Sequence, residues 1–328
     1  MQPYLAIDGD YNAINQIYNV MTVQQIQYLV ALNRHRHFSN AAEECGVSQP
    51  TLSAMIQKLE DELDVKIFDR SKHPIEPTPI GEKIIRQAER TLNEMNRIAE
   101  IVTDETSSLN GSLKLGIIPT IAPYIVPRFI GLFTRKNPTV TLTINEMTTA
   151  NIIKNLEQGN LDMAILATPL EHPSILEIPL YYEHFVAYIG EDNPLLDNDI
   201  FPADPPEEGM WVLQEGHCLR NQVANYCHMK NNANHIYEAG AIDTLVRIVD
   251  CNGGFTLIPE LHVQFLSESQ RSRTRTLANP PAVREVSIVV REDYVKERML
   301  NAVADVIKMI VPSELIDERM KRFAIRLK

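Results

Sequence analysis

The sequence predicts an α/β protein made of an N-terminal winged helix-turn-helix, one long helix and a larger C-terminal domain. Three observations carry this prediction. A helix-turn-helix pattern spans Phe38 to Gln57, and an apolar seam with helical spacing runs from residue 80 to residue 102. Short apolar strands then alternate with helical stretches up to residue 310. Such alternation favours a largely parallel sheet.

The composition is that of an ordinary globular protein, with 44% hydrophobic residues in a chain of 328, which is long enough for two or three domains. No apolar run approaches the roughly 18 residues of a membrane span, and Asp8 and Asp10 interrupt any signal peptide. We therefore expect a cytoplasmic protein without a membrane partner, whose four cysteines form no disulfide framework.

The charge does not by itself predict a nucleic-acid partner. The net charge of −12 argues against nonspecific DNA binding by the whole surface. Residues 21–75 carry six basic and seven acidic side chains. A prediction of DNA binding therefore rests on the geometry of the motif.

Periodicity and composition divide the chain into five segments. These are a polar, Asn-rich extension at 1–20, the helix-turn-helix domain at 21–79, the long helix at 80–108, the C-terminal domain at 111–312 and a basic tail at 313–328. The tail is amphipathic, and both a surface helix and a contact with a partner remain open for it.

The first domain begins with helical patterns from Thr22, from about Ser39 and from about Ser48. Gly46, four residues after Ala42, marks the turn between the second and third helices. Small or apolar side chains lie at the spacing that buries them where the helices cross: Ala41, Cys45, Val47, Leu52 and Met55. Cys45 is interpreted as a small buried side chain.

The third helix is the candidate DNA-reading helix. Ser48 is a suitable N-cap, and Pro50 fits the first helical turn. The exposed start of the helix offers groups suited to base edges and phosphates of double-stranded DNA: Ser48, Gln49, Pro50, Thr51, Ser53 and Lys58. A helical hairpin that binds no DNA is the alternative. Val65–Phe68 then predicts a short strand, and Ser71–Pro79, with three prolines, predicts a wing.

An apolar seam follows the wing. Its residues recur every three or four positions: Ile80, Ile84, Ala88, Leu92, Met95, Ala99 and Val102. The seam predicts a helix of about 25 residues, and because helices this long usually pack on a partner helix, we expect a homodimer. An ordinary amphipathic surface helix is the alternative.

Ser107 to Gly111 breaks the helical pattern, and the C-terminal domain begins. Its predicted strands are Leu113–Ile118, Val140–Ile144, Met163–Leu166, Phe185–Ile189, Phe255–Ile258 and Val286–Val290. Cys251 has no basic neighbour and is interpreted as a structural cysteine.

A cysteine pair within and just after Glu215–Gln222 carries the most specific chemistry. His217 and Arg220 flank Cys218, and such neighbours lower the pKa of a thiol. Attack of a Cys218 thiolate on a peroxide gives a sulfenic acid, which Cys227 is placed to trap as a disulfide. On one helix, nine residues of separation give about 13 Å of rise and opposite faces. Because a disulfide needs Cα atoms within about 7 Å, a helical segment must unfold locally to form it, and oxidation then switches its conformation.

Two other interpretations of the pair stay open. One is a zinc site, although closely spaced ligand pairs are absent; its candidate ligands are His217, Cys218, Cys227, His228 and His235. The other is that both cysteines are buried and inert.

Two sets of motifs resemble the LysR-type transcriptional regulators. They comprise Phe38–Ala42, Val47–Ser53, Ile56, Leu59–Glu60, Leu63 and Phe68–Arg70, and later Gly253–Pro259. The resemblance runs from Met21 onward and implies a winged helix-turn-helix, a dimerising helix and a two-lobed effector domain of periplasmic-binding-protein shape. It also implies a non-enzymatic regulator, without a cofactor, that acts at promoters with RNA polymerase as a dimer or tetramer. Pro74, Pro77 and Pro79 make the wing stiffer than the family pattern, which puts its contacts with the DNA backbone in question.

The cysteine segment resembles the sensing segment of the hydrogen peroxide-responsive members of that family. By this resemblance Cys218 is the peroxidatic thiol and Cys227 the resolving thiol. The implied peroxide pocket comprises Thr120, Thr149, His217, Arg220 and Arg284. The hydroxyl of Thr120 would hold the peroxide, and Arg284 would stand ahead of a strand. The alternative for Thr149 and Arg284 is that they are ordinary polar residues on the protein surface. Asn221 departs from the acidic residue expected beside Arg220.

The leading functional hypothesis is a peroxide-activated transcription regulator of antioxidant genes. A second is a LysR-type regulator that binds a small metabolite between its lobes, where the Thr120 loop would bind a carboxylate. A third is a thiol peroxidase, which would use the same cysteine chemistry but needs no DNA-reading domain.

Overall fold

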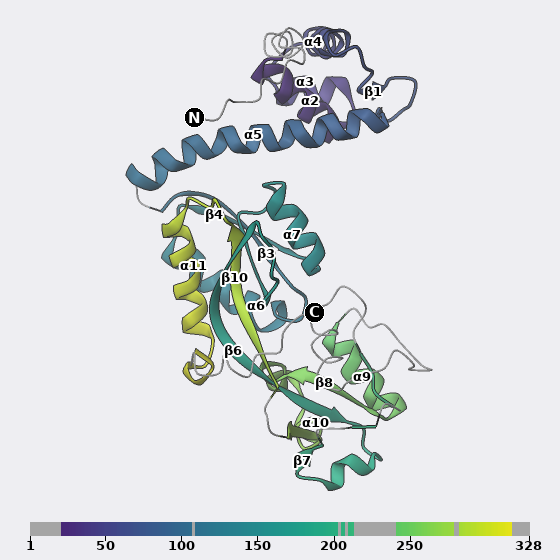
Figure 1. Ribbon diagram of the computed structural model, residues 1–328, viewed down its shortest axis with the longest axis vertical. Helices are drawn as coiled ribbons and strands as arrows, with labels where there is room; N and C mark the ends of the chain where they lie inside the picture. The colour runs from purple at the N-terminus through teal and green to yellow at the C-terminus, as the bar shows by residue number, and fades with distance from the viewer. Residues whose placement is uncertain are drawn as a thin grey trace, which may run out of the picture. The chain divides into compact units, whose positions relative to one another are not determined.

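The structure, a computed structural model, describes residues 21–106, 109–202, 205–206, 209–212, 241–278 and 282–316, without side chains at 96, 97 and 99–106. Two compact units divide the chain, Met1–Val102 and Thr103–Lys328, and each is described by itself (Figure 1). The predicted extension at 1–20 and the tail beyond Ile316 lie outside the described residues. None of the described helices is long and apolar enough to cross a membrane.

The described part of the first unit begins with three helices: α2 (Val23–His35), α3 (Phe38–Glu44) and α4 (Gln49–Glu62). Thr22 and Gln25 form a capping box at the start of α2, in which each side chain accepts from the other's backbone amide. The Ser48 hydroxyl accepts from the Thr51 amide at 3.3 Å and caps α4. Gly46, between α3 and α4, has a φ of +66°, which favours glycine. The three predicted helices and their turn are confirmed.

The core of the first unit lies where these helices cross. Its fully buried side chains include Leu29, Leu32, Ala41, Leu52, Ile56 and Leu59. Burying one such leucine stabilises the fold by about 1.5–3 kcal/mol. Val47 and Met55 pack half-buried against this core. Cys45 is also only half-buried, less than predicted, and burial raises the pKa of its thiol.

A two-stranded wing follows α4, in which β1 (Phe68–Asp69) pairs antiparallel with β2 (Glu76–Pro77). The predicted strand at Val65–Phe68 is wrong in extent, because the strand begins only at Phe68. Glu60 is the reason. Its buried carboxylate accepts from the Ile67 amide at 2.8 Å and the Phe68 amide at 3.1 Å, so these amides bond a side chain instead of a strand partner.

The long helix α5 spans Pro79–Thr106. Ile85, outside the predicted seam, is buried in the core of the first unit. Two residues of the seam, Ile80 and Met95, are 44% and 41% exposed, and Ile98 is 67% exposed. An apolar face of this kind fits the predicted helix–helix dimer contact, which stays a prediction.

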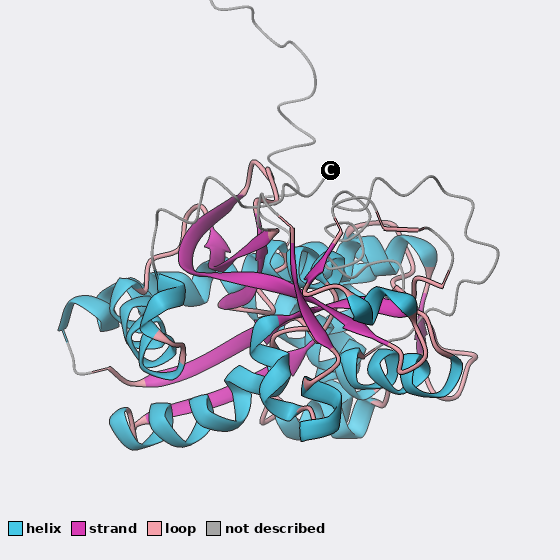
Figure 2. Ribbon diagram, turned by 90° about the horizontal axis from the view of Figure 1, so that it is seen from below, coloured by secondary structure: helices cyan, strands magenta, loops and turns pink. Residues whose placement is uncertain are grey.

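The second unit contains an eight-stranded sheet with helices around it (Figure 2). The strands are β3 (Gly111–Ile117), β4 (Val140–Glu146), β5 (Met163–Thr168), β6 (Ile175–Ile189), β7 (Ile200–Phe201), β8 (Phe255–Pro259), β9 (Thr274–Leu277) and β10 (Val283–Arg291). The helices are α6 (Ala122–Lys136), α7 (Thr149–Glu157), α9 (Ile242–Asn252), α10 (Glu268–Arg271) and α11 (Glu297–Ile310), with 3-10 turns η1 (Pro194–Asp197), η2 (Glu260–Phe265) and η3 (Ser313–Ile316).

The strand order is β4-β3-β5-β10-β6-β9-β7, with β8 paired to β6. β3 runs parallel to β4 and β5, and β7 runs parallel to β9. The pairs β5–β10, β10–β6, β6–β8 and β6–β9 are antiparallel. The predicted largely parallel sheet is therefore wrong. β10 returns through the middle of the sheet against both neighbours, and an alternation of strands and helices does not reveal the direction of a returning strand.

β6 begins at Ile175, well before the predicted strand at Phe185–Ile189. The pairing register with β10 shifts near Pro179, which indicates a bulge. Proline is tolerated there because it has no amide to donate to the ladder. The same residue breaks the strand pattern in the sequence, which explains why the first part of β6 is not predicted.

Two separate cores confirm the two-lobed arrangement. The first includes Phe129, Phe133, Ile165, Tyr181 and Ile288, and the second includes Tyr188, Phe201, Val249, Phe255 and Ile258. β6 and β10 run from one lobe into the other (Figure 1). Glu183 on β6 and Arg284 on β10 are buried where the strands cross between the two cores.

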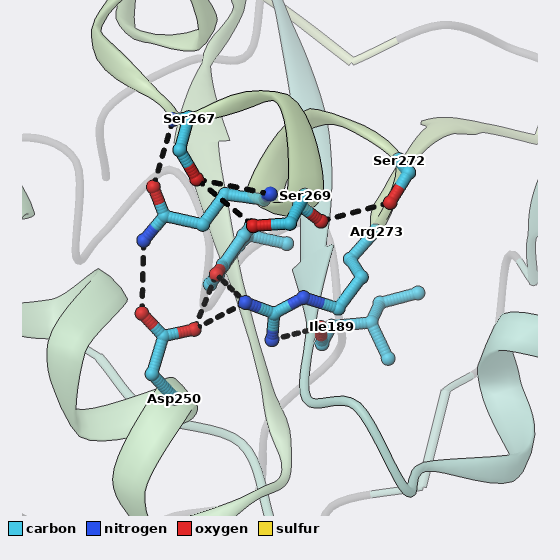
Figure 3. A network of polar contacts seen from close by, with 8 residues as sticks. Ile189, Asp250, Ser267, Ser269, Ser272 and Arg273 are labelled. Carbon is cyan, nitrogen blue, oxygen red and sulfur yellow. Dashed lines mark hydrogen bonds and ion pairs between the residues drawn. The ribbon is translucent and has the colours of Figure 1, made fainter.

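A polar network ties the second lobe together (Figure 3). Arg273 donates to Asp250 and to the Tyr188 hydroxyl, each at 2.6 Å, and Gln270 donates to Asp250 at 2.9 Å. The network connects the end of β6 to α9 and α10. Cys251, the next residue on α9, is exposed. Its predicted structural role is therefore wrong, because this part of α9 turns its buried face away from position 251.

Candidate functional site

A buried ion pair marks the junction of the two lobes. Arg284 and Glu183 are directly opposite in the antiparallel register, so their side chains share one face. The Arg284 Nε and Nη2 atoms lie 2.8 and 2.7 Å from Glu183 Oε2, and both side chains are fully buried. The expected position of Arg284 ahead of a strand is wrong, because β10 begins at Val283. The start of β10 is hard to predict from the sequence because the charged Glu285 follows Arg284. In the structure Glu285 is buried, and its carboxylate accepts a hydrogen bond from Thr168 at 2.8 Å.

Thr120 is held by this arginine. It follows the end of β3 and is 2% exposed. Arg284 Nη1 donates to Thr120 Oγ1, and Nη2 donates to the Thr120 carbonyl oxygen, both at 3.0 Å. Tyr124 donates to the same carbonyl oxygen at 2.6 Å and itself accepts from Arg284. The structure thus brings two of the predicted pocket residues together, and Arg284 is not the surface residue that the alternative supposed.

The electrostatics of the pair keep a cation beside Thr120. Burial raises the pKa of Glu183, and Arg284 opposes that rise. Burial also opposes the charge of Arg284, but Glu183 outweighs this effect and raises the arginine pKa. The second Glu183 oxygen accepts from the Leu261 amide at 3.0 Å, which links the pair to η2. Burial raises the pKa of Tyr124, so that its phenol stays protonated.

Thr149 lies at the same edge of the sheet as Thr120. It is the first residue of α7, three positions after the end of β4, and it is half-buried. β3 and β4 are adjacent and parallel, and the Met147 amide donates to Ile117 O at 3.0 Å, which joins the two strand ends. Ligands of α/β sheets commonly bind beyond such carboxyl ends. The hydrogen bonds of Arg284 described above go to Glu183, Thr120 and Tyr124, and do not include Thr149.

Residues 213–240 lie outside the described part of the chain. They include the remaining predicted site residues and zinc candidates, namely His217, Cys218, Arg220, Asn221, Cys227, His228 and His235. Within the described ranges, no group of three metal-binding side chains occurs.

His262, on η2, is a second buried titratable group near the pair. It is 1% exposed, and among the described residues neither ring nitrogen has a hydrogen-bond partner, although Asp243 Oδ1 lies 3.5 Å from Nε2. Burial lowers the pKa of His262, Arg284 adds to this, and Asp243 opposes it. His184, on β6, differs, because its hydrogen bond to Glu260 raises its pKa.

These two histidines predict opposite pH effects on the stability of the second unit. Because the pKa of His262 is lowered by folding, its neutral form favours the folded state, and stability is lost as the pH falls below its unfolded value of about 6.5. His262→Leu should therefore reduce the loss of melting temperature between pH of about 7.5 and 5.5. His184→Gln should increase that loss, since a raised pKa stabilises the fold below the unfolded value. Equal acid sensitivity of both variants and the wild type would contradict the assignment.

Comparison with known proteins identifies the family. The family model described as "LysR substrate binding domain" matches residues 106–310, and the one described as "Bacterial regulatory helix-turn-helix protein, lysR family" matches residues 23–82. The chain belongs to the LysR family. The family resemblance expected from the sequence is thereby confirmed, as are the helix-turn-helix and the effector domain.

Relatives within the LysR family have specific names. A hydrogen peroxide-inducible genes activator of Haemophilus influenzae is 33% identical over 301 residues, which cover 89% of this chain and 99% of that protein. The full-length C199D variant of OxyR of Pseudomonas aeruginosa has a similar structure, with a TM-score of 0.73, 33% identity and coverage of 88% of this chain and 95% of that one. A hydrogen peroxide-bound OxyR mutant of Corynebacterium glutamicum has a TM-score of 0.57 at 27% identity, covering 88% and 92% of the two chains.

The helix-turn-helix of this LysR-family chain presents most of the predicted DNA contacts. Ser48, Gln49, Pro50 and Thr51 are exposed at the start of α4. The Ser48 hydroxyl lies 2.8 Å from that of Thr51, so both hydroxyls also serve the helix cap. Ser53 is half-buried, which corrects the expected exposure, because it turns partly toward the core. Lys58 is exposed and lies 3.6 Å from Glu62.

Sequence reasoning missed Glu183 and Tyr124. Each leaves a trace in the sequence. Glu183 is a lone acid in the strand pattern from Leu180 to Phe185, and a charge in such a pattern points to a buried partner. Tyr124 follows Thr120 by four residues, which is one helical turn. Neither trace identifies the partner strand, because the register of β6 and β10 is set by long-range pairing.

Proposed function

We propose that this LysR-family regulator senses hydrogen peroxide through Cys218 and Cys227 and thereby changes its action at promoter DNA. The observation that carries the proposal is the Arg284–Thr120 contact, buried at the position that the family resemblance assigns to peroxide binding. The names of the relatives support the same function.

The proposed chemistry begins with the Cys218 thiolate. Its sulfur attacks one peroxide oxygen, an S–O bond forms and the O–O bond breaks, and the departing hydroxide takes up a proton to become water. The Cys227 thiol then attacks the sulfenic sulfur, forms the disulfide and releases a second water. Two thiols are oxidised and one peroxide is reduced. The Thr120 hydroxyl would donate a hydrogen bond to the peroxide oxygen that gains charge.

The assembly and partners form part of the proposal. The helix-turn-helix would bind double-stranded DNA through α4, and the exposed apolar residues of α5 would form a homodimer, two of which would make a tetramer. Activation would proceed through RNA polymerase, in the cytoplasm, where both thiols start reduced. A switch of this kind reacts once for each reduction and has no need of enzymatic turnover or a cofactor.

A pair of substitutions at Thr120 tests the proposal. Thr120→Val keeps the shape but removes the hydroxyl, and we expect Cys218 to react with peroxide about a hundredfold more slowly. Thr120→Ser keeps the hydroxyl and should stay within about threefold of the wild type, a difference too small to represent a lost hydrogen bond. Stopped-flow measurement of disulfide formation against peroxide concentration gives both rates. Wild-type kinetics for Thr120→Val would rule out the peroxide-binding role of Thr120.

A further inference from the structure

The donor and acceptor roles of the Thr120 hydroxyl are fixed by its contact with Arg284. Arg284 carries only donors, so Thr120 Oγ1 must be the acceptor in their 3.0 Å contact. A hydroxyl has one proton, and the structure gives the Thr120 hydroxyl no acceptor among the described residues. Its proton is therefore left to donate to a molecule bound beside it. The direction of that donation depends on how firmly the threonine and the guanidinium are held.

Glu183 fixes the guanidinium. Its Oε2 accepts from Arg284 Nε at 2.8 Å and lies 2.7 Å from Nη2 in the ion pair, and its Oε1 accepts from the Leu261 amide at 3.0 Å. Because a guanidinium is planar, two contacts on one edge also set the direction of the remaining Nη1 donor. That donor is the one that reaches the Thr120 hydroxyl.

Tyr124 fixes the backbone of Thr120. Its hydroxyl lies 2.6 Å from the Thr120 carbonyl oxygen and 3.3 Å from Glu183 Oε2. One proton serves one strong hydrogen bond, and the shorter distance assigns it to the carbonyl oxygen. Arg284 Nη2 donates to the tyrosine oxygen, which closes a ring of contacts around the threonine. All four side chains are buried.

We infer that Tyr124 and Glu183 are positioning residues that aim the Thr120 hydroxyl proton at the peroxide, an inference that rests on the proposed function above. Neither residue touches the reacting atoms. Tyr124 holds the threonine backbone, and Glu183 holds the arginine that polarises the hydroxyl. Small displacements of a donor weaken its effect on a transition state strongly, so both residues should affect the peroxide reaction more than the general reactivity of the thiol.

The test compares two reactions of full-length protein, oxidation of Cys218 by hydrogen peroxide and its alkylation by iodoacetamide, which needs no donor to a departing oxygen. Tyr124→Phe removes only the hydroxyl, and we expect its peroxide rate to fall roughly tenfold with the alkylation rate unchanged. Glu183→Gln, which keeps the shape of the side chain, should lower the same ratio. Tyr188→Phe is the matched control, because it removes a tyrosine hydroxyl from the separate Asp250–Arg273 network (Figure 3), and its ratio should equal that of the wild type.

A double variant shows whether Tyr124 acts through Thr120. If it does, Thr120→Val combined with Tyr124→Phe should be no slower than Thr120→Val alone. The inference is overturned if the two losses multiply, if Tyr124→Phe lowers both reactions equally, or if it keeps the wild-type ratio. Exposed Cys251 serves as the reference thiol in the same chain. If wild-type Cys218 is oxidised no faster than Cys251, the proposed function itself fails, which separates the two outcomes.

Discussion

Arg284→Met is expected to lower the free energy of unfolding of the second unit by about 3–5 kcal/mol. The substitution removes a guanidinium that is fully buried against Glu183 and leaves the carboxylate in the interior, where the Leu261 amide still donates to it at 3.0 Å. Taking a charge out of water without its partner is far more costly than losing an exposed ion pair. Chemical denaturation, followed by a spectroscopic signal that comes from the second unit, measures the difference in the free energy of unfolding between the variant and the wild type.

Arg291→Met is the matched control for this prediction. Arg291 lies on the same strand and pairs with Asp293 at 2.7 Å, but the two side chains are 26% and 50% exposed. Its loss should change stability by less than about 1 kcal/mol. Adding Glu183→Gln to Arg284→Met should recover part of the loss, because the buried charge is then neutralised. Equal effects of Arg284→Met and Arg291→Met would show that the buried pair does not stabilise the junction of the lobes.

Gly81→Ala is expected to destabilise the first unit by about 3 kcal/mol or more. A Cβ at this position would lie 2.0 Å from the Ile67 carbonyl oxygen, and a backbone atom cannot turn aside as a side chain does. The same stretch is tied down further, since the Thr78 amide donates to Ile67 O at 2.9 Å and the Thr78 hydroxyl donates to Lys66 O at 2.6 Å. The start of α5 must therefore separate from the wing.

The control for this prediction is Gly131→Ala on α6. Among the described residues, no atom beyond the neighbouring backbone of the same helix lies within 4 Å of a Cβ built there, and the residue is helical and exposed. Alanine should stabilise this helix by about 0.5–1 kcal/mol, because glycine has the greater freedom in the unfolded chain. The two glycine-to-alanine changes thus have opposite predicted signs, and thermal unfolding of each variant measures both. If Gly81→Ala is as stable as the wild type and still binds DNA, the backbone of Gly81 does not lie as close to the Ile67 carbonyl oxygen as described.

The local parts of the fold are predictable from the sequence. The helix-turn-helix follows from residues that act over one turn, such as Gly46 at the turn and Ser48 at the cap. The wing strand is less predictable, because Glu60 competes for its backbone amides. The sheet is mixed instead of largely parallel because the direction of β10 depends on pairing with strands more than a hundred residues away in sequence.

The site is predictable only where the family resemblance supplies residues. Thr120 and Arg284 are predicted and lie together, at 3.0 Å. Glu183 and Tyr124 are not predicted, because a buried ion pair becomes apparent only when the register of β6 and β10 is known. The resemblance assigned a role to Arg284, but its burial and its hold on Thr120 are properties of the folded sheet.

The most direct test of the account is a titration of reduced, full-length protein with hydrogen peroxide, followed by mass-spectrometric mapping of disulfides. We expect a single disulfide between Cys218 and Cys227, complete at about one peroxide per chain. Cys45, whose pKa is raised by burial, and Cys251 should remain free thiols. If Cys218 and Cys227 stay unlinked at peroxide levels that oxidise Cys45 or Cys251, the pair is not the sensor and the central claim is wrong.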